Sequence, residues 1–111
     1  MTMRDYQFYV KDILDAMEAI DTFAAGMEFD QFKADDKTSS AVIRKFEIIG
    51  EAAKHIPDSI RDKYPDVPWK EMAGMRDKLI HFYMGVKYEL VWQTIKDVIP
   101  QIKPVLRQMI K

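Results

Sequence analysis

Apolar residues recur at helical spacing along the first quarter of the chain. Steps of four and three residues separate Tyr6, Val10, Ile13, Met17, Ile20 and Ala24. Because an α-helix completes a turn in about 3.6 residues, these steps bring the side chains onto one face. Acidic residues occupy the other faces, and Gly26 is a residue suited to a helix end. The pattern predicts a long amphipathic helix that ends before Gly26.

Two further apolar stripes follow in the middle of the chain. The first of them consists of Val42, Phe46, Ile49, Ala53 and Ile56. It is preceded by the N-cap residues Asp35, Asp36, Thr38 and Ser39, and Pro57 ends it. The next consists of Trp69, Met72, Met75, Leu79 and Phe82, between Pro68 and Gly85. Each stripe predicts a long helix. Pro68 suits the first turn of the second of these helices, and Gly85 suits its end.

A last helix is predicted over residues 87–110. Its apolar side consists of Leu90, Val91, Ile95, Val98, Ile102, Val105, Leu106 and Met109. Pro100 and Pro104 should kink or divide this helix, because each removes an N–H from the hydrogen-bond ladder. Trp69 and Trp92 are predicted to be core or interface anchors.

These elements indicate the fold class. Four long helices with short connections predict an all-α helical bundle, with additional short helical turns at 28–34 and 58–63. No strand pattern of alternating polarity is convincing. A chain of 111 residues is the size of one domain, so residues 1–111 are predicted to form a single helical domain.

Composition excludes several functional classes. The chain has no cysteine, which rules out disulfides, thiolate metal sites and cysteine nucleophiles. Glycine-rich phosphate loops are absent, and the only histidines, His55 and His81, are far apart. We therefore expect neither a metal nor a cofactor. No transmembrane run and no signal-peptide apolar block are present, so a cytoplasmic protein without a membrane partner is expected.

Charge is unevenly distributed along the chain. The formal net charge of −1 argues at first against a nucleic-acid partner. However, residues 1–75 carry a net charge of −5 and residues 76–111 a net charge of +4. A basic segment can meet phosphates even when the whole chain is nearly neutral. The alternative is a solvated basic face that pairs with the acidic part of the same chain.

Candidate chemistry concentrates at the end of the third predicted helix, where Arg76, His81 and Tyr83 occur within eight residues. An arginine can hold a phosphate through two parallel N–H bonds, and a histidine can accept or donate a proton near neutral pH. Tyr83 can hydrogen-bond a phosphate or accept a modification on its hydroxyl. Without metal ligands, these residue types favour RNA cleavage in which the ribose 2′-OH attacks the adjacent phosphorus.

Helix geometry separates the first two of these residues. Arg76 and His81 lie about 140° apart around an ideal helix, so they do not converge within one regular helix. Either the helix loosens before Gly85, or a second copy of the chain completes the site. The second option, together with the extensive apolar stripes, predicts a homodimer.

Ordinary structural roles also account for the three residues. Arg76 can pair with Glu71 or Asp97 on the surface, and His81 can complement a helix dipole. Tyr83 can be a core aromatic whose hydroxyl reaches water. The pattern alone leaves these explanations open.

The arrangement Arg76, four residues, His81, one residue, Tyr83 resembles the R-x4-H-x-Y signature of HepT toxins, a branch of the HEPN superfamily. The stretches 49–53 (IGEAA), 64–69 (YPDVPW) and 74–77 (GMRD) follow the order of that family, as do Gly85-Val86 and Trp92. The resemblance covers nearly the whole chain. One departure is Lys87, where relatives often carry an aspartate.

This resemblance implies a HEPN-type bundle, usually dimeric, that acts as a metal-independent endoribonuclease. Arg76 and His81 match the catalytic positions. Asp77 is the polar residue that follows the arginine, and Glu51 is expected to face the same cleft. The resemblance also implies a type VII toxin-antitoxin pair, in which an MntA-like minimal nucleotidyltransferase silences the toxin by attaching AMP to the motif tyrosine, here Tyr83.

Two hypotheses of different class remain. In the first, the chain is a toxin that cleaves RNA. In the second, it is a non-catalytic helical partner of a nucleotidyltransferase, and its basic C-terminal third binds that partner or its nucleotide. Cleavage assays on protein unmodified at Tyr83 distinguish them.

Overall fold

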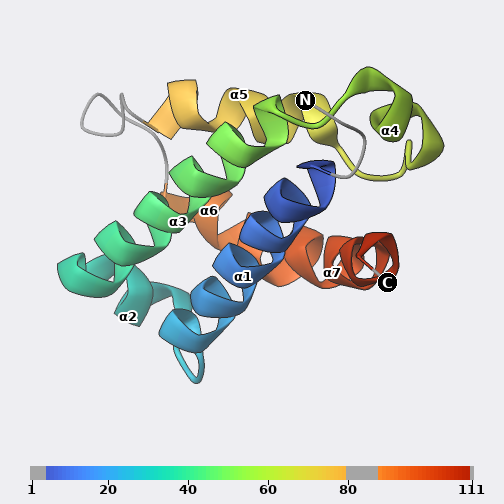
Figure 1. Cartoon of the computed structure of the whole chain (residues 1–111). Coiled ribbons are helices and arrows are strands. Elements are labelled where there is room, and N and C mark those ends of the chain that lie inside the picture. The colour runs from blue at the N-terminus through green and yellow to red at the C-terminus, as the bar shows by residue number, and fades with distance from the viewer. Residues whose placement is uncertain (1–4, 80–87, 111) are drawn as a thin grey trace.

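A computed structural model describes residues 5–79 and 88–110, with the side chains of Arg76, Lys78 and Leu79 outside the described part. Helices, turns and loops make up these ranges, and no strand occurs in them (Figure 1). The elements are α1 (Tyr6–Ala24), α2 (Phe29–Ala34), α3 (Asp36–Lys54), α4 (Asp58–Lys63), α5 (Trp69–Leu79), α6 (Tyr88–Gln93), the π-helical turn η3 (Thr94–Val98) and α7 (Ile99–Met109). The all-α prediction is confirmed, including the short helices α2 and α4.

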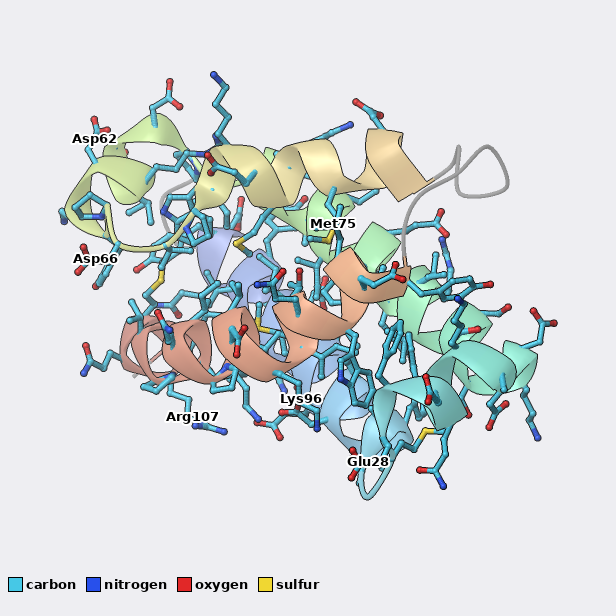
Figure 2. The ribbon with its side chains drawn as sticks, turned by 180° about the vertical axis from the view of Figure 1, so that it is seen from behind. Glu28, Asp62, Asp66, Met75, Lys96 and Arg107 are labelled. Carbon is cyan, nitrogen blue, oxygen red and sulfur yellow. The ribbon has the colours of Figure 1, made fainter. Side chains whose placement is uncertain are left out.

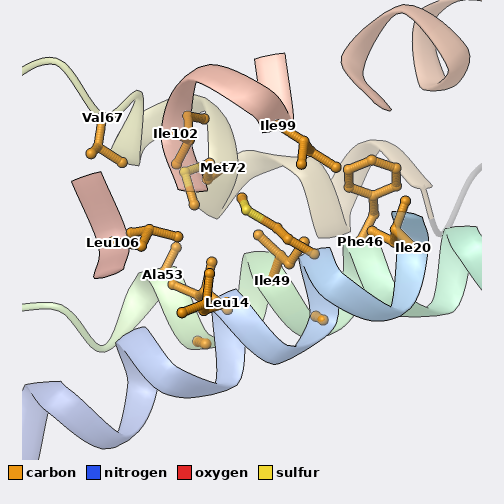
Figure 3. Packing of buried hydrophobic residues seen from close by; sticks show 14 of the residues in the cluster. Leu14, Ile20, Phe46, Ile49, Ala53, Val67, Met72, Ile99, Ile102 and Leu106 are labelled. Atoms are coloured by element: carbon orange, nitrogen blue, oxygen red, sulfur yellow. The ribbon is translucent and has the colours of Figure 1, made fainter. Parts of the chain in front are cut away.

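Helix α3 is the centre of the bundle, because it packs along both α1 and α5, while α7 crosses α1 (Figure 1). The predicted stripes of α1 and α3 supply much of the core. Buried members of these stripes are Val10, Ile13, Met17, Ile20 and Ala24 on α1, and Val42, Phe46, Ile49 and Ala53 on α3. Figure 3 shows Leu106 of α7 beside Ala53 and Leu14, and Met72 of α5 beside Ile102. Burial of these faces is the main force that holds the helices together.

A glycine and a capping carboxylate set the C-terminal end of α1 and the start of α3. After α1, Gly26 adopts a φ of 75°, a left-handed conformation that glycine tolerates without strain. At the start of α3, the Asp35 carboxylate accepts hydrogen bonds from the Thr38 backbone N–H at 3.0 Å and the Thr38 hydroxyl at 2.8 Å. These bonds lower the pKa of Asp35 below its ordinary value. The predicted helix stop and N-cap region are both confirmed.

The predicted C-terminal helix is divided before Pro100. Helix α6 passes into the π-helical turn η3, and α7 then continues through Pro104, which does not end it. Val91, Ile95 and Ile99 are buried at steps of four residues. The wider π-helical turn helps to keep this spacing on one face, because it contains more residues than an α-helical turn. Leu90 precedes this buried series and is 59% exposed. Its predicted place on the apolar face is therefore wrong, because the buried face of α6 is centred on Val91.

Charged side chains join α7 to α1. The Lys103 ammonium donates to Asp21 at 2.6 Å and lies 3.4 Å from Glu18, while Arg107 donates to Glu18 at 2.7 Å. Figure 2 shows Arg107 on the outer side of α7. Two cations of the basic C-terminal segment thus pair with the acidic N-terminal helix. This agrees with the alternative in which the basic segment pairs with the acidic part of the same chain.

Of the helices in the described ranges, none has both the length and the apolar character needed to cross a membrane.

Candidate active site

Helix α5 carries the first residue of the motif. Arg76 lies within this helix, three residues before the last residue of α5, and its side chain is outside the described part. His81 and Tyr83 lie in residues 80–87 and are also outside it. The predicted separation of Arg76 and His81 around a helix, and its consequence for a second copy of the chain, therefore stay predictions.

Two acidic residues singled out from the sequence are linked by one lysine. The Lys54 ammonium lies 3.9 Å from the Glu51 carboxylate on its own helix, α3, and 4.0 Å from the Asp77 carboxylate on α5. All three side chains are exposed to solvent. The structure thus places Glu51 and Asp77 around a common cation, immediately beside the position of Arg76 in the chain.

Sequence reasoning did not single out Lys54. The sequence does carry two signals for it: its i, i+3 spacing from Glu51, and its place in the last turn of α3, where a cation is favourable. The contact with Asp77 was not visible, because it depends on how α5 packs against α3. A sequence pattern carries no direct signal for such a tertiary ion pair.

The C-terminal end of α3 is fixed by neighbouring helices. Arg61 of α4 donates to the Ala53 carbonyl at 2.7 Å and to the Ile56 carbonyl at 3.1 Å. On the other side, the His55 ring stacks on Tyr9 of α1, with centroids 4.6 Å apart and planes at 14°. Lys54 is thus held on a helix end that two neighbouring helices, α4 and α1, position.

Helix α5 is fixed at its start by Trp69. The indole is buried, and its N–H donates to the Tyr64 carbonyl at 3.1 Å. Met72, one turn later, is also buried and faces the core. These contacts set the direction in which α5 delivers Arg76, and they confirm Trp69 as a core anchor.

The chain that follows residues 80–87 is fixed by aromatic rings. The Tyr88 ring packs edge-on against Phe32 of α2, with ring centroids 6.4 Å apart, and the centroid of the Trp92 ring lies 5.0 Å from that of Phe32. Phe29 contacts Trp92 at 6.3 Å, and the Lys96 ammonium lies 4.7 Å from the Trp92 ring centroid. Trp92 is therefore an anchor between α6 and α2. The segment that carries His81 and Tyr83 is consequently joined at both ends to helices with fixed neighbours.

An apolar hollow of about 240 Å³ lies between α5 and the C-terminal helices. Met75 lines it and lies between α5 and the last helices in Figure 2. Its only polar lining residues in the described part are Glu71 and Thr94. Among the described residues, none that lines this hollow carries the positive charge that would stabilise a reacting phosphate.

Within residues 5–79 and 88–110, no three histidine or carboxylate side chains gather in a way that could hold a metal ion.

Comparison with known proteins decides the family. The family model described as "Ribonuclease HepT-like" matches residues 13–109. The chain belongs to the HepT-like ribonuclease family. The resemblance based on the R-x4-H-x-Y motif is therefore confirmed. The matched region contains α3, α5 and α7 and the C-terminal part of α1.

Named HepT-like relatives align over almost their whole length. "Putative RNase MJ1216" of Methanocaldococcus jannaschii is 49% identical over 111 residues, which are 100% of this chain and 92% of the relative. "Probable ribonuclease HepT" of Thermococcus cleftensis is 48% identical over 100 residues, 90% of this chain and 91% of the relative. "Putative RNase TTE0752" of Caldanaerobacter subterraneus is 42% identical over 103 residues, 93% and 92% of the two chains. No solved structure matches the chain.

Proposed function

We propose that this HepT-like chain is a metal-independent endoribonuclease. The observation that carries the proposal is the complete R-x4-H-x-Y motif, Arg76, His81 and Tyr83, in a chain of the HepT-like ribonuclease family. The names of the relatives support the same activity. The packing of α5 against α3 supports a fixed position for the start of the motif.

The proposed reaction uses the ribose 2′-OH as the nucleophile. His81 accepts the 2′-OH proton as the oxygen attacks the adjacent phosphorus, and the bond from phosphorus to the 5′ oxygen breaks. The products are a 2′,3′-cyclic phosphate and a 5′-OH, which receives a proton from an acid. Arg76 stabilises the charge that develops on the non-bridging oxygens. DNA lacks the 2′-OH and should not be cleaved.

Two copies of the chain complete the proposed site. A two-fold dimer brings two sets of Arg76 and His81 together, so that one histidine acts as base and the other as acid. Light scattering at micromolar concentration should therefore give twice the mass of the chain. A monomeric mass would contradict the dimer.

Tyr83 is the proposed regulatory residue of a toxin in a type VII toxin-antitoxin pair. An MntA-like nucleotidyltransferase antitoxin would transfer AMP to its hydroxyl, which adds bulk and negative charge where an RNA phosphate must bind. Intact mass spectrometry of protein co-expressed with the partner should show whole AMP additions, and Tyr83→Phe should abolish them. Unchanged mass in the wild-type chain would contradict this regulation.

Cleavage by unmodified protein tests the central proposal. The wild-type chain, incubated with RNA in excess EDTA, should cleave it, whereas His81→Ala and Arg76→Ala should lose cleavage at least about 100-fold. Arg44 on α3 offers a matched control. Arg44→Ala should retain activity, and circular dichroism should show unchanged helix content in all three variants.

Two results would overturn the proposal. Wild-type cleavage that requires a divalent metal would contradict the metal-independent reaction, and a fully active His81→Ala variant would contradict the assignment of the base. Complete absence of cleavage would favour the non-catalytic partner of a nucleotidyltransferase instead.

A further inference from the structure

The contact between α3 and α5 beside the motif carries an inference about the charge around the reaction. Lys54 ends α3, and Asp77 directly follows Arg76 on α5. The Lys54 ammonium is 3.9 Å from Glu51 and 4.0 Å from Asp77, so it lies close to both carboxylates. Both distances exceed the usual length of an N–H···O hydrogen bond. The interaction is therefore mainly electrostatic.

The position of these charges matters for an anionic substrate. Asp77 adjoins Arg76 in the chain, and consecutive Cα atoms are about 3.8 Å apart. Two carboxylates at this place would repel an RNA phosphate and compete with it for the arginine. A lysine between them lowers that repulsion, and the effect extends over distances comparable to the Debye length, about 10 Å at 0.1 M salt.

We propose that Lys54 is a positioning residue of the ribonuclease site, which neutralises Glu51 and Asp77 so that Arg76 remains available to the RNA phosphate. This inference rests on the proposed ribonuclease function. Lys54 acts here through the two carboxylates and does not itself touch the substrate. Its place at the end of α3 is secured by the Arg61 hydrogen bonds to the Ala53 and Ile56 carbonyls.

Steady-state cleavage of a short RNA oligonucleotide tests this role. At low salt, about 0.05 M, Lys54→Gln should lower kcat/KM about three- to fivefold, mainly through a higher KM. At about 0.5 M salt, where charges are screened, the difference should fall below about twofold. Lys54→Arg should retain wild-type behaviour, because it preserves the cation.

Removing a carboxylate together with the lysine separates neutralisation from other roles. The double variants Lys54→Gln/Asp77→Asn and Lys54→Gln/Glu51→Gln each remove one carboxylate together with the lysine. At least one of them should recover the low-salt kcat/KM to within about twofold of wild type. Arg44→Gln is the matched control, since Arg44 lies on the same helix, 3.9 Å from Glu47 at the same i, i+3 spacing. It should leave both the activity and its salt dependence unchanged.

The outcomes distinguish this inference from the proposed function. An active wild-type chain with an unchanged Lys54→Gln variant would overturn the role of Lys54 alone. Loss of activity in Lys54→Gln that neither double variant recovers, or that is equal at both salt concentrations, would also overturn it. A wild-type chain that does not cleave the oligonucleotide would overturn the ribonuclease function and, with it, this inference.

Discussion

The guanidinium of Arg61 donates a 2.7 Å hydrogen bond to the carbonyl oxygen of Ala53 in the last turn of α3. A second N–H of the same group reaches the Ile56 carbonyl at 3.1 Å. Carbonyls at a helix C-terminus have no partners within the helix, so a planar cation with several donors satisfies them well. The same turn carries Lys54, which makes Arg61 a support of the charged group beside the motif.

Arg61→Ala should therefore destabilise the fold by about 1–3 kcal/mol, because two hydrogen bonds from a charged donor are lost. Urea unfolding followed by circular dichroism measures this change. Arg61→Lys should recover less than half of the loss, since an ammonium cannot reproduce the fork-shaped pair of donors. Lys63→Ala, an exposed change on the same short helix, is the control and should stay within about 0.5 kcal/mol. Equal stability of Arg61→Ala and wild type would contradict the proposed cap.

Phe32 should be one of the most sensitive core positions. Its side chain is 0% exposed and contacts the rings of Tyr88 and Trp92, which fix α6 after the motif segment. Phe32→Ala should cost about 3–5 kcal/mol, because a buried ring is removed and a cavity remains. Phe8→Ala provides the contrast, since Phe8 is 70% exposed and should change stability by less than about 0.5 kcal/mol. Similar denaturation midpoints for the two variants would contradict this distribution of packing energy.

Periodicity predicted the helices well where one helix buries one regular face. The steps of four and three residues from Val10 to Ala24 correspond to buried positions, and Gly26 and Asp35 mark the neighbouring helix boundaries. These features are local, because they depend on helix geometry and on side chains that bond to nearby backbone.

The same reasoning was wrong for Leu90, which is 59% exposed. Successive residues lie about 100° apart around a helix, so Leu90 is turned away from the face on which Val91 and Ile95 are buried, and its apolar character alone was misleading. Lys54 was missed for a different reason. Its partner Asp77 is distant in sequence and becomes a neighbour only through the packing of α5 on α3.

Acid should destabilise the protein through Glu18 and Asp35. The hydrogen bond from Arg107 lowers the pKa of Glu18 below its ordinary 4.5, and the Thr38 N–H lowers the pKa of Asp35 below 3.8. A carboxyl whose pKa is lower in the folded than in the unfolded chain stabilises the fold fully above the unfolded pKa. That contribution is lost as pH falls through the folded pKa.

The melting temperature should therefore decrease as pH is lowered below about 4.5, and it should decrease less steeply in Glu18→Gln. Thermal melts at a series of pH values between about 6 and 3 measure the slope. Asp35→Asn should also flatten it, while retaining an acceptor for the Thr38 N–H. A slope in Glu18→Gln identical to that of wild type would contradict a stabilising role of its pair with Arg107.

Lys103 should contribute more to stability than an exposed lysine pair. Its side chain is 15% exposed and donates to Asp21 at 2.6 Å, and this bond raises the pKa of Lys103 above its ordinary 10.5. Because the folded pKa is the higher one, the stabilisation is complete below the unfolded pKa and is lost as pH rises through the folded pKa. Lys103→Met keeps most of the apolar stem but leaves Asp21 and Glu18 without this cation.

At neutral pH, Lys103→Met should lower the free energy of unfolding by about 1 kcal/mol, because the lysine is mostly buried whereas the side chains of Asp21 and Glu18 are 38% and 49% exposed and water screens the pair. Lys11→Met is the matched control, since Lys11 forms an exposed i, i+4 pair with Asp15 at 3.2 Å on the same α1 surface. It should change stability by less than about 0.5 kcal/mol. Adding Asp21→Asn to Lys103→Met should recover part of the loss, because the uncompensated carboxylate is then removed. Urea unfolding of the wild type, the two single variants and the double variant measures these differences. An equal effect of the Lys103 and Lys11 substitutions would show that burial of Lys103 adds nothing to the strength of its pair with Asp21.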